Sequence, residues 1–244
     1  MRKYFFFLGG IILCSAAAQA QVPDLSAVLP QGGGTAAGRI IQLIALLTVL
    51  SVAPGLLVMV TSFTRFAVAL SFLRSGLGLQ TTPANLILIS LSLFMTIYVM
   101  APTFDKAWET GVKPLVENSM PEQEAFGKIV EPFREFMLSQ VRQKDLNLFA
   151  ELARDSFKAK EETKSEIRVL IPAFMISELR RGLEIGFLIG LPFLVIDMIV
   201  STLTMSMGMM MLPPSVIALP LKILFFILID GWNLVIGSLI KSFV

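Results

Sequence analysis

The charged residues of this chain are concentrated in its middle third. Residues 1–104 carry six Asp, Glu, Lys or Arg side chains, residues 105–181 carry 27, and residues 182–244 carry five. Apolar runs lie on both sides of the charged third, at residues 40–60, 85–101, 185–203 and 217–240. Each run approaches the ~20 residues that a helix needs to cross a bilayer. The pattern predicts an all-α, membrane-associated protein of two apolar helical hairpins, with a polar helical insert between them.

Composition excludes several classes of function. The 244 residues include no histidine and one cysteine, Cys14, so the chain lacks the side chains of zinc enzymes and of histidine-dependent catalytic triads. A net charge of +2 is too small to attract nucleic acid. The sequence has no glycine-rich phosphate loop followed by Lys and Ser or Thr. We therefore expect no metal, no cofactor, no nucleic-acid partner and no enzymatic activity.

The first twenty residues have the pattern of a cleaved signal peptide. Two basic residues precede the apolar stretch 4–13, and residues 18–20, Ala-Gln-Ala, match a signal peptidase site. Cleavage after Ala20 would place the new N-terminus on the periplasmic side of a bacterial inner membrane. An uncleaved membrane helix is an alternative, but the apolar stretch is much shorter than a span. Lipid modification of Cys14 is disfavoured by the bulky leucine before it.

The remaining boundaries follow the charge pattern. We predict a flexible, glycine-rich lead-in at residues 21–38, a first hairpin at 39–104, the insert at 105–181 and a second hairpin at 182–244. The loop 61–83 carries Arg65 and Arg74 without an acidic residue, which favours a cytoplasmic loop and a periplasmic insert. Arg180 and Arg181, at the outer end of the third run, argue against that orientation.

The insert itself has a helical pattern. Apolar side chains recur at steps of three and four residues over 126–141 and again over 146–157, which predicts two amphipathic helices. Residues 154–166 are polar and of mixed charge, which is typical of a solvated linker.

Several charged side chains lie inside or beside the later apolar runs, where a lone charge costs at least ~2.5 kcal/mol in lipid. They are Glu178, Glu184, Asp197, Lys222 and Asp230. Asp197 lies about 14 residues before the turn at 211–216 and Lys222 about six after it, so the two are poorly matched in depth. We therefore expect pairing between neighbouring copies, or with Glu178. A buried salt bridge that fixes helix register is favoured over a proton relay.

Small residues and prolines mark the apolar helices. Gly182, Gly186 and Gly190 recur every four residues, which predicts a helix face where another backbone approaches closely. Pro54, Pro192 and Pro220 lie within the runs and predict kinked or broken helices.

Methionines cluster near the tip of the second hairpin. Five lie within seven residues, at Met205, Met207, Met209, Met210 and Met211. Methionine is apolar, unbranched and flexible, so a ring of these side chains from several copies could close a pore and deform around a passing chain. Ordinary filling of a membrane helix is the alternative interpretation.

Paired carboxylates raise one enzymatic alternative. Asp197 and Asp230 lie in different apolar runs, and two carboxylates can activate water as in an aspartyl protease. The Gly-x-Gly-Asp context expected of an intramembrane protease is missing, and Lys222 offers a structural partner, so this interpretation is disfavoured.

Two segments resemble the paired signatures of the FliP family. Residues 172–179 read PAFMISEL, and residues 192–201 read PFLVIDMIVS and run into MSMGM at 205–209. The LSFLR segment at 70–74, the hairpin plan and the signal peptide support the resemblance. It implies a core subunit of the flagellar type III secretion export gate, a channel for unfolded flagellar proteins. A virulence-type SctR subunit and a structural nucleus for rod assembly remain the alternatives.

The resemblance also implies partners and placement. Several copies, with a pentamer expected, would form a pseudo-helical ring with FliR and FliQ, and FlhB and FlhA would join them. The family's methionine gasket would fall on Met209, Met210 and Met211, with Met205 and Met207 nearby. Much of the core would lie on the periplasmic side of the inner membrane, in the flagellar basal body. Its apolar helices would then be buried against other subunits, and the charges within them would pair between subunits.

Overall fold

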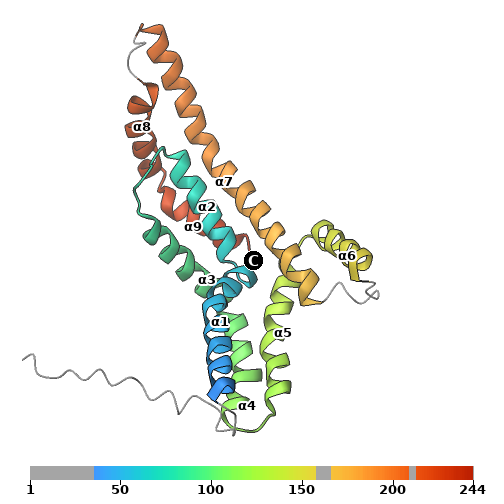
Figure 1. Ribbon diagram of the computed structural model, residues 1–244. Helices are drawn as coiled ribbons and strands as arrows, with labels where there is room; N and C mark the ends of the chain where they lie inside the picture. Colours follow the sequence, from blue (N-terminus) through green and yellow to red (C-terminus); the bar gives the residue numbers. More distant parts are fainter. Residues whose placement is uncertain (1–35, 158–165, 209–212, 244) are drawn as a thin grey trace, which may run out of the picture. The chain divides into compact units, whose positions relative to one another are not determined.

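The structure is a computed structural model that describes residues 36–157, 166–208 and 213–243. Within these residues all regular secondary structure is helical, so the predicted all-α fold is confirmed (Figure 1). The predicted signal peptide and the lead-in up to residue 35 lie outside the described residues. The chain divides into two compact units, Met1–Leu50 and Ser51–Val244.

Helix α1, Ala36–Val60, runs across the boundary between the two units. In the first unit its apolar side chains, such as Ile41, Ile44 and Leu47, are exposed. Pro54 lies within the helix, which continues past it. Exposed apolar side chains on a long helix need lipid or another chain to cover them.

The loop predicted at residues 61–83 is instead largely a helix. Helix α2, Phe63–Gly76, buries Phe66, Ala69, Leu70 and Leu73, which lie on one helical face. Helix α2 packs against α7, Ile167–Ser206, and Val68 and Phe72 lie next to its glycines. The apolar helical period of this segment, and not its lack of acidic residues, indicates its structure.

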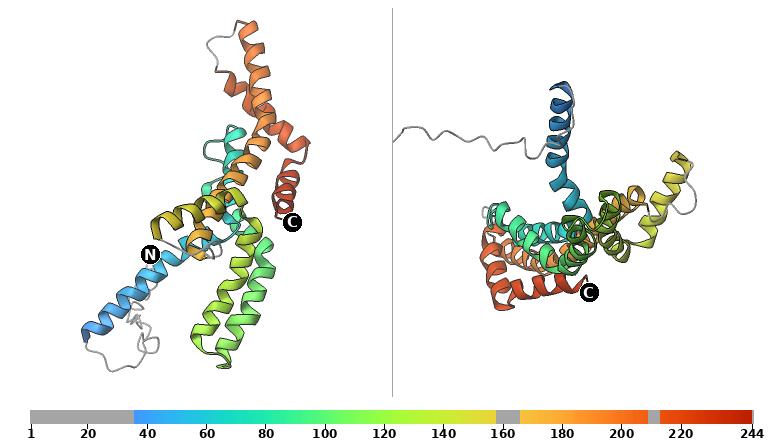
Figure 2. Two further views of the ribbon diagram at one scale, coloured as in Figure 1. Left: turned by 90° about the vertical axis from the view of Figure 1, so that its right-hand side faces the viewer. Right: turned by 90° about the horizontal axis from the view of Figure 1, so that it is seen from below.

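The boundary predicted between residues 104 and 105 falls inside a helix. Helix α3, Asn85–Ala107, continues through a π-helical turn, Trp108–Val112, into the short α4, Lys113–Val116. Helix α5, Glu122–Gln140, then runs back beside α3, as Figures 1 and 2 show. The two amphipathic helices predicted in the insert are present as α5 and as α6, Gln143–Phe157.

Helix α7 is the element on which the second unit is assembled. Its 40 residues correspond to about 60 Å at the usual rise per residue, and the predicted boundary at 181/182 lies within it. One hydrophobic core joins its N-terminal part to α5 and α6, and includes Met137, Leu146, Ala150, Leu170 and Phe174. A second core joins its later part to α2, α3, α8 and α9, and includes Phe66, Leu70, Leu73, Phe193 and Phe226.

The last apolar run is broken after its middle, and the break is not at a proline. Helices α8, Pro214–Leu228, and α9, Gly231–Lys241, meet at 66°. Between them Asp230 has a left-handed backbone with φ of 50°, which a continuous right-handed helix cannot accommodate. Pro192 and Pro220 lie inside helices that continue past them. These prolines therefore do not break the helices, and the kinks predicted as the other possibility stay a prediction.

By length and composition, three helical stretches of the described residues could cross a membrane: Leu43–Val60, Asn85–Val116 and Ile167–Ser206. The bent pair α8 and α9 would make a fourth if it forms one span. The membrane-associated class predicted from sequence is therefore supported by long apolar helices. The first stretch nearly coincides with the predicted run 40–60, and the other two contain the runs 85–101 and 185–203 but are longer.

The glycine stripe of α7 faces α2 at two of its three positions. A Cβ placed on Gly182 would lie 3.1 Å from Val68 Cβ, and one on Gly186 would lie 2.6 Å from Phe72 Cβ. At Gly190 nothing lies within 4 Å of that point. The two helices therefore approach so closely at Gly186 that even a methyl group does not fit without movement.

We predict that Gly186→Ala lowers the free energy of unfolding by about 1–3 kcal/mol, because the new methyl group overpacks against the fixed base of Phe72. Thermal unfolding of the detergent-solubilised chain, followed by helical circular dichroism, measures the change. Gly190→Ala is the matched control on the same helix, and it should be neutral or slightly stabilising. Equal losses for both variants would contradict the close approach.

Candidate functional site

The side chains of Arg65 and Glu178 form a fully buried ion pair between α2 and α7. Both side chains are 0% exposed. Arg65 Nε donates to Glu178 Oε2 at 2.9 Å, and Arg65 Nη2 donates to Glu178 Oε1. The guanidinium and carboxylate thus meet in the two-pronged geometry that makes such pairs strong and directional.

The rest of the Arg65 guanidinium is bound by two further parts of the chain. Its Nη1 donates to the backbone oxygen of Ser242 at 2.9 Å and to Ser242 Oγ at 3.0 Å. Its Nη2 also donates to Gln140 Oε1 at 3.2 Å. The Phe243 ring covers it, with its centroid 3.5 Å from Arg65 Cζ. One side chain therefore connects α2, the end of α5, α7 and the segment after α9.

The buried ion pair is stable only when both charged partners are present. Burial lowers the pKa of the Arg65 guanidinium, while the hydrogen bond and charge of Glu178 act in the opposite direction. A buried charge without its partner is strongly destabilising, whereas a fully hydrogen-bonded pair is tolerated. The charge pattern of the sequence indicates for Arg65 only a contribution to the positive charge of a cytoplasmic loop. The periodic apolar residues around it were the signal that could have placed it on a buried helix face.

Lys222 and Asp197 pair within one chain, contrary to the expected mismatch in depth. Lys222 Nζ donates to Asp197 Oδ2 at 2.6 Å and to the backbone oxygen of Gly76 at 3.0 Å. Asp197 lies nine residues before the end of α7 at Ser206, and Lys222 lies eight after the start of α8 at Pro214. Counted from the helix ends the two positions are level, whereas a count from a turn at 211–216 makes them unequal.

This second ion pair borders solvent. The Lys222 side chain is 7% exposed and that of Asp197 is 48% exposed. Both line a cavity of about 540 Å³, together with residues from the end of α2 and the start of α8. The pair thus ties α7, α8 and the end of α2 together beside a water-accessible cavity.

The other two predicted charges are at the surface. Glu184 is 56% exposed and accepts a hydrogen bond from Arg180 Nε at 2.8 Å. Asp230 is exposed and accepts a hydrogen bond from Asn233 Nδ2 at 3.2 Å. Glu184 and Asp230 are therefore not buried in the single chain, and Asp197 and Asp230 each bind another side chain.

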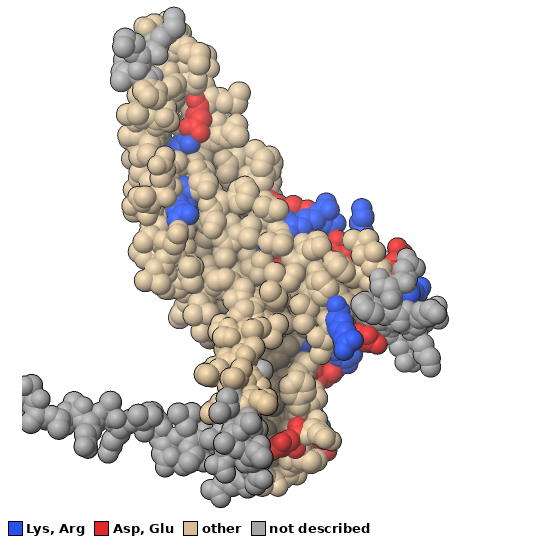
Figure 3. All heavy atoms as spheres, in the orientation of Figure 1, with Lys and Arg blue, Asp and Glu red and all other residues tan. Residues whose placement is uncertain are grey.

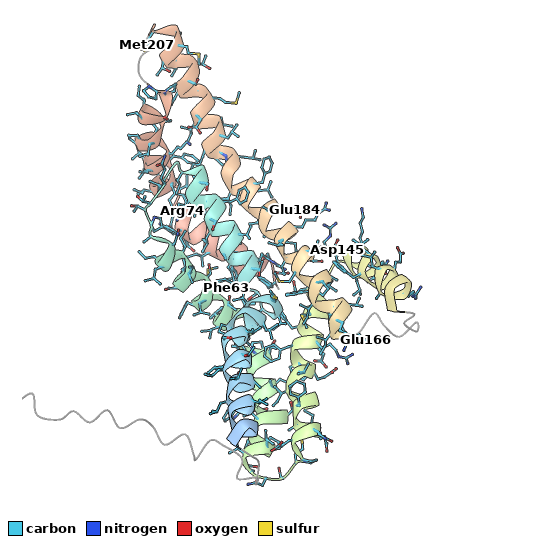
Figure 4. All side chains as sticks on the ribbon, in the orientation of Figure 1. Phe63, Arg74, Asp145, Glu166, Glu184 and Met207 are labelled. Atoms are coloured by element: carbon cyan, nitrogen blue, oxygen red, sulfur yellow. The ribbon has the colours of Figure 1, made fainter. Side chains whose placement is uncertain are left out.

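The described methionines of the tip are exposed. Met205 lies in the last turn of α7 and is 66% exposed, and Met207 follows the helix and is 73% exposed (Figure 4). Met209, Met210 and Met211 lie outside the described residues. Among the described residues no group of three or more His, Cys, Asp or Glu side chains could hold a metal ion.

Comparison with known proteins gives consistent results. The sequence model of the FliP family matches residues 46–239. The chain is 55% identical to the flagellar biosynthetic protein FliP of Rhizobium meliloti (strain 1021), over 100% of both chains. It is 62% identical to that of Agrobacterium fabrum (strain C58 / ATCC 33970), over 86% of both chains. It is 49% identical to that of Bacillus subtilis (strain 168), over 83% of this chain and 91% of the relative.

We predict that Glu178→Ala lowers the free energy of unfolding by about 3–5 kcal/mol, because Arg65 is left as a buried charge without its counter-ion. Thermal unfolding in detergent measures it. The double variant Arg65→Met with Glu178→Leu should lose clearly less free energy of unfolding than the sum of the losses of Arg65→Met alone and Glu178→Leu alone. The control Lys106→Gln breaks an exposed pair with Glu135 and should cost less than about 1 kcal/mol.

Proposed function

Because the chain belongs to the FliP family, and is thereby a membrane-associated component of the flagellar export apparatus, we propose that it is a core subunit of the export gate. In this proposal several copies, five by the family resemblance, form a ring with FliR and FliQ. Unfolded flagellar proteins pass through the centre of the ring. FlhB and FlhA act next to it in the same apparatus.

The observation that carries the proposal is the extent of exposed apolar surface on the later helices. Phe187, Leu188 and Met198 of α7 are each more than half exposed, and similar side chains cover α3 and α8. Figure 3 shows one face of the molecule, and the part over α7 and α8 is a broad surface with few charged atoms. Soluble monomers rarely expose contiguous apolar areas of this kind, which mark protein or membrane contacts.

The packing of the chain supports a channel made of several copies. Helices α2 and α7 are in direct contact along the glycine positions, and α3, α8 and α9 share the core between them. An unfolded polypeptide needs a bore between helices, and these helices fill their own interior with side chains. A lumen shared by several subunits around one axis satisfies this geometric requirement.

The methionine tip fits the role of a gasket for such a channel. Lys222 and Asp197 join α7 to α8 about two turns before the helix ends, so the tip is held by a hairpin with a fixed base. Beyond that base, the exposed Met205 and Met207 offer flexible apolar side chains. We place Met209, Met210 and Met211 in the same gasket, closing the pore when no substrate is present.

Placement in the cell forms part of the proposal. The signal-peptide pattern favours the bacterial inner membrane, with α5 and α6 on the periplasmic side. The relatives are named flagellar biosynthetic proteins, which favours the flagellar system over a virulence-type SctR subunit. A nucleus for rod assembly is compatible with the channel, because the same ring could serve as its base.

We predict that replacing Met209, Met210 and Met211 by Ala makes the assembled gate leak ions, because the smaller side chains no longer fill the closed pore. Ion flux into cells, or conductance of the purified complex in planar bilayers, provides the measurement. Met175→Ala, on α7 far from the tip in sequence, is the control and should leave the pore closed. Unchanged conductance in a triple variant that assembles would refute the gasket.

A further inference from the structure

A cluster of arginines lies where the end of α5, the start of α6 and α7 meet. Arg142 lies between α5 and α6, and Arg180 and Arg181 lie on α7. Figure 3 shows basic atoms beside acidic ones over this part of α7, and Figure 4 labels Glu184 and Asp145 at the same place. The positive-inside rule gives no reason for these cations in a periplasmic segment.

The carboxylates nearby are already bound. Glu178 belongs to the buried Arg65, and Glu184 accepts its hydrogen bond from Arg180. Asp145 is buried and accepts a hydrogen bond from Ser177 Oγ at 2.7 Å. Among the described side chains named here, four guanidinium groups, including that of Arg65, stand against three carboxylates, which leaves an excess of one positive charge.

The excess charge falls on Arg142 and Arg181. Arg181 Nη1 donates to the neutral oxygen of Gln140 at 3.1 Å, and no ion pair of Arg181 is found within the described residues. Arg142 Nη1 is buried and makes no hydrogen bond, and its approach to Glu184 Oε1 is 4.0 Å. A buried guanidinium nitrogen without an acceptor is costly, and a carboxylate is the acceptor that its geometry fits.

We propose that this arginine cluster receives a carboxylate from a neighbouring subunit of the assembled gate. Glu184 already bridges towards both Arg180 and Arg142, so the cluster has the geometry to hold a carboxylate. The inference rests on the proposed function, because it requires a multi-subunit assembly. Arginine is enriched at protein interfaces and among the residues that contribute most to binding.

The surroundings favour a protein carboxylate over a lipid phosphate. Exposed apolar side chains flank the cluster along α7 on both sides, with Ile176 and Leu179 before it and Leu183 and Phe187 after it. A headgroup site would have lipid on one side and water on the other. An acidic side chain set in an apolar face of a partner subunit would match both the positive charge of the cluster and the apolar side chains beside it.

The test is assembly of the gate from the full chain co-expressed with FliQ and FliR, solubilised in mild detergent and weighed by native mass spectrometry. Arg142→Gln with Arg181→Gln should reduce the fraction of chain in the large complex at least tenfold. Arg168→Gln, an exposed arginine on the same helix, should leave that fraction unchanged. Assembly of the double variant at the wild-type level would overturn the inference, while failure of the wild-type chain to assemble would instead contradict the proposed function.

Two further measurements keep the result interpretable. The circular dichroism spectrum of the unassembled double variant should match that of the wild type. Arg142→Lys keeps the positive charge but lacks the planar guanidinium that binds a carboxylate with two hydrogen bonds, so it should assemble to an intermediate level. Motile suppressors of Arg142→Glu should carry Asp or Glu changed to Lys or Arg in a neighbouring subunit. If the double variant loses bound phospholipid but assembles normally, the cluster binds lipid. If the double variant is unfolded while Arg142→Lys assembles fully, the cluster serves folding. Either result overturns the inference.

Discussion

The buried pair of Arg65 and Glu178 is the interaction on which the arrangement of the second unit depends. The Arg65 guanidinium reaches α7 through Glu178, the end of α5 through Gln140, and the segment after α9 through Ser242 and Phe243. Apolar packing could tolerate small shifts between these elements, but a buried charge requires its acceptors in fixed positions. Helix α2 therefore has one register against α7, and the close approach at Gly186 follows from it.

Helix α7 carries two different environments along its length. Its N-terminal part bears Glu178, Arg180, Arg181 and Glu184 and packs against the amphipathic α5 and α6. Its later part is apolar, carries one charge at Asp197, and ends at the exposed methionines. A rigid helix with these two ends can connect a polar periplasmic region to a pore-closing tip, which is the function proposed for it.

The single chain leaves two kinds of unsatisfied surface. Apolar side chains such as Phe187 and Leu188 are exposed, and Arg142 Nη1 is buried without a hydrogen bond. Apolar surface supplies most of the free energy of association but little direction, whereas a charged group within it selects partner and orientation. Both surfaces fit the proposal that the chain is one subunit of a larger assembly, in which neighbouring subunits would cover the apolar side chains and supply a carboxylate.

The sequence by itself determined the fold class, the amphipathic α5 and α6 and the unusual positions of Glu178, Asp197 and Lys222, because hydrophobic period and charge segregation are local properties. The family followed from the resemblance of the segments 172–179 and 192–201 to its signatures. The sequence did not reveal α2 as a buried helix, the partner of Lys222 or the break at Asp230. Those depend on which helix ends lie level and which faces meet, and residues over 100 positions apart, such as Arg65 and Glu178, find each other only when the chain folds. Tertiary structure alone decided these pairings, since a charge shows in sequence that it needs a partner but not where the partner lies.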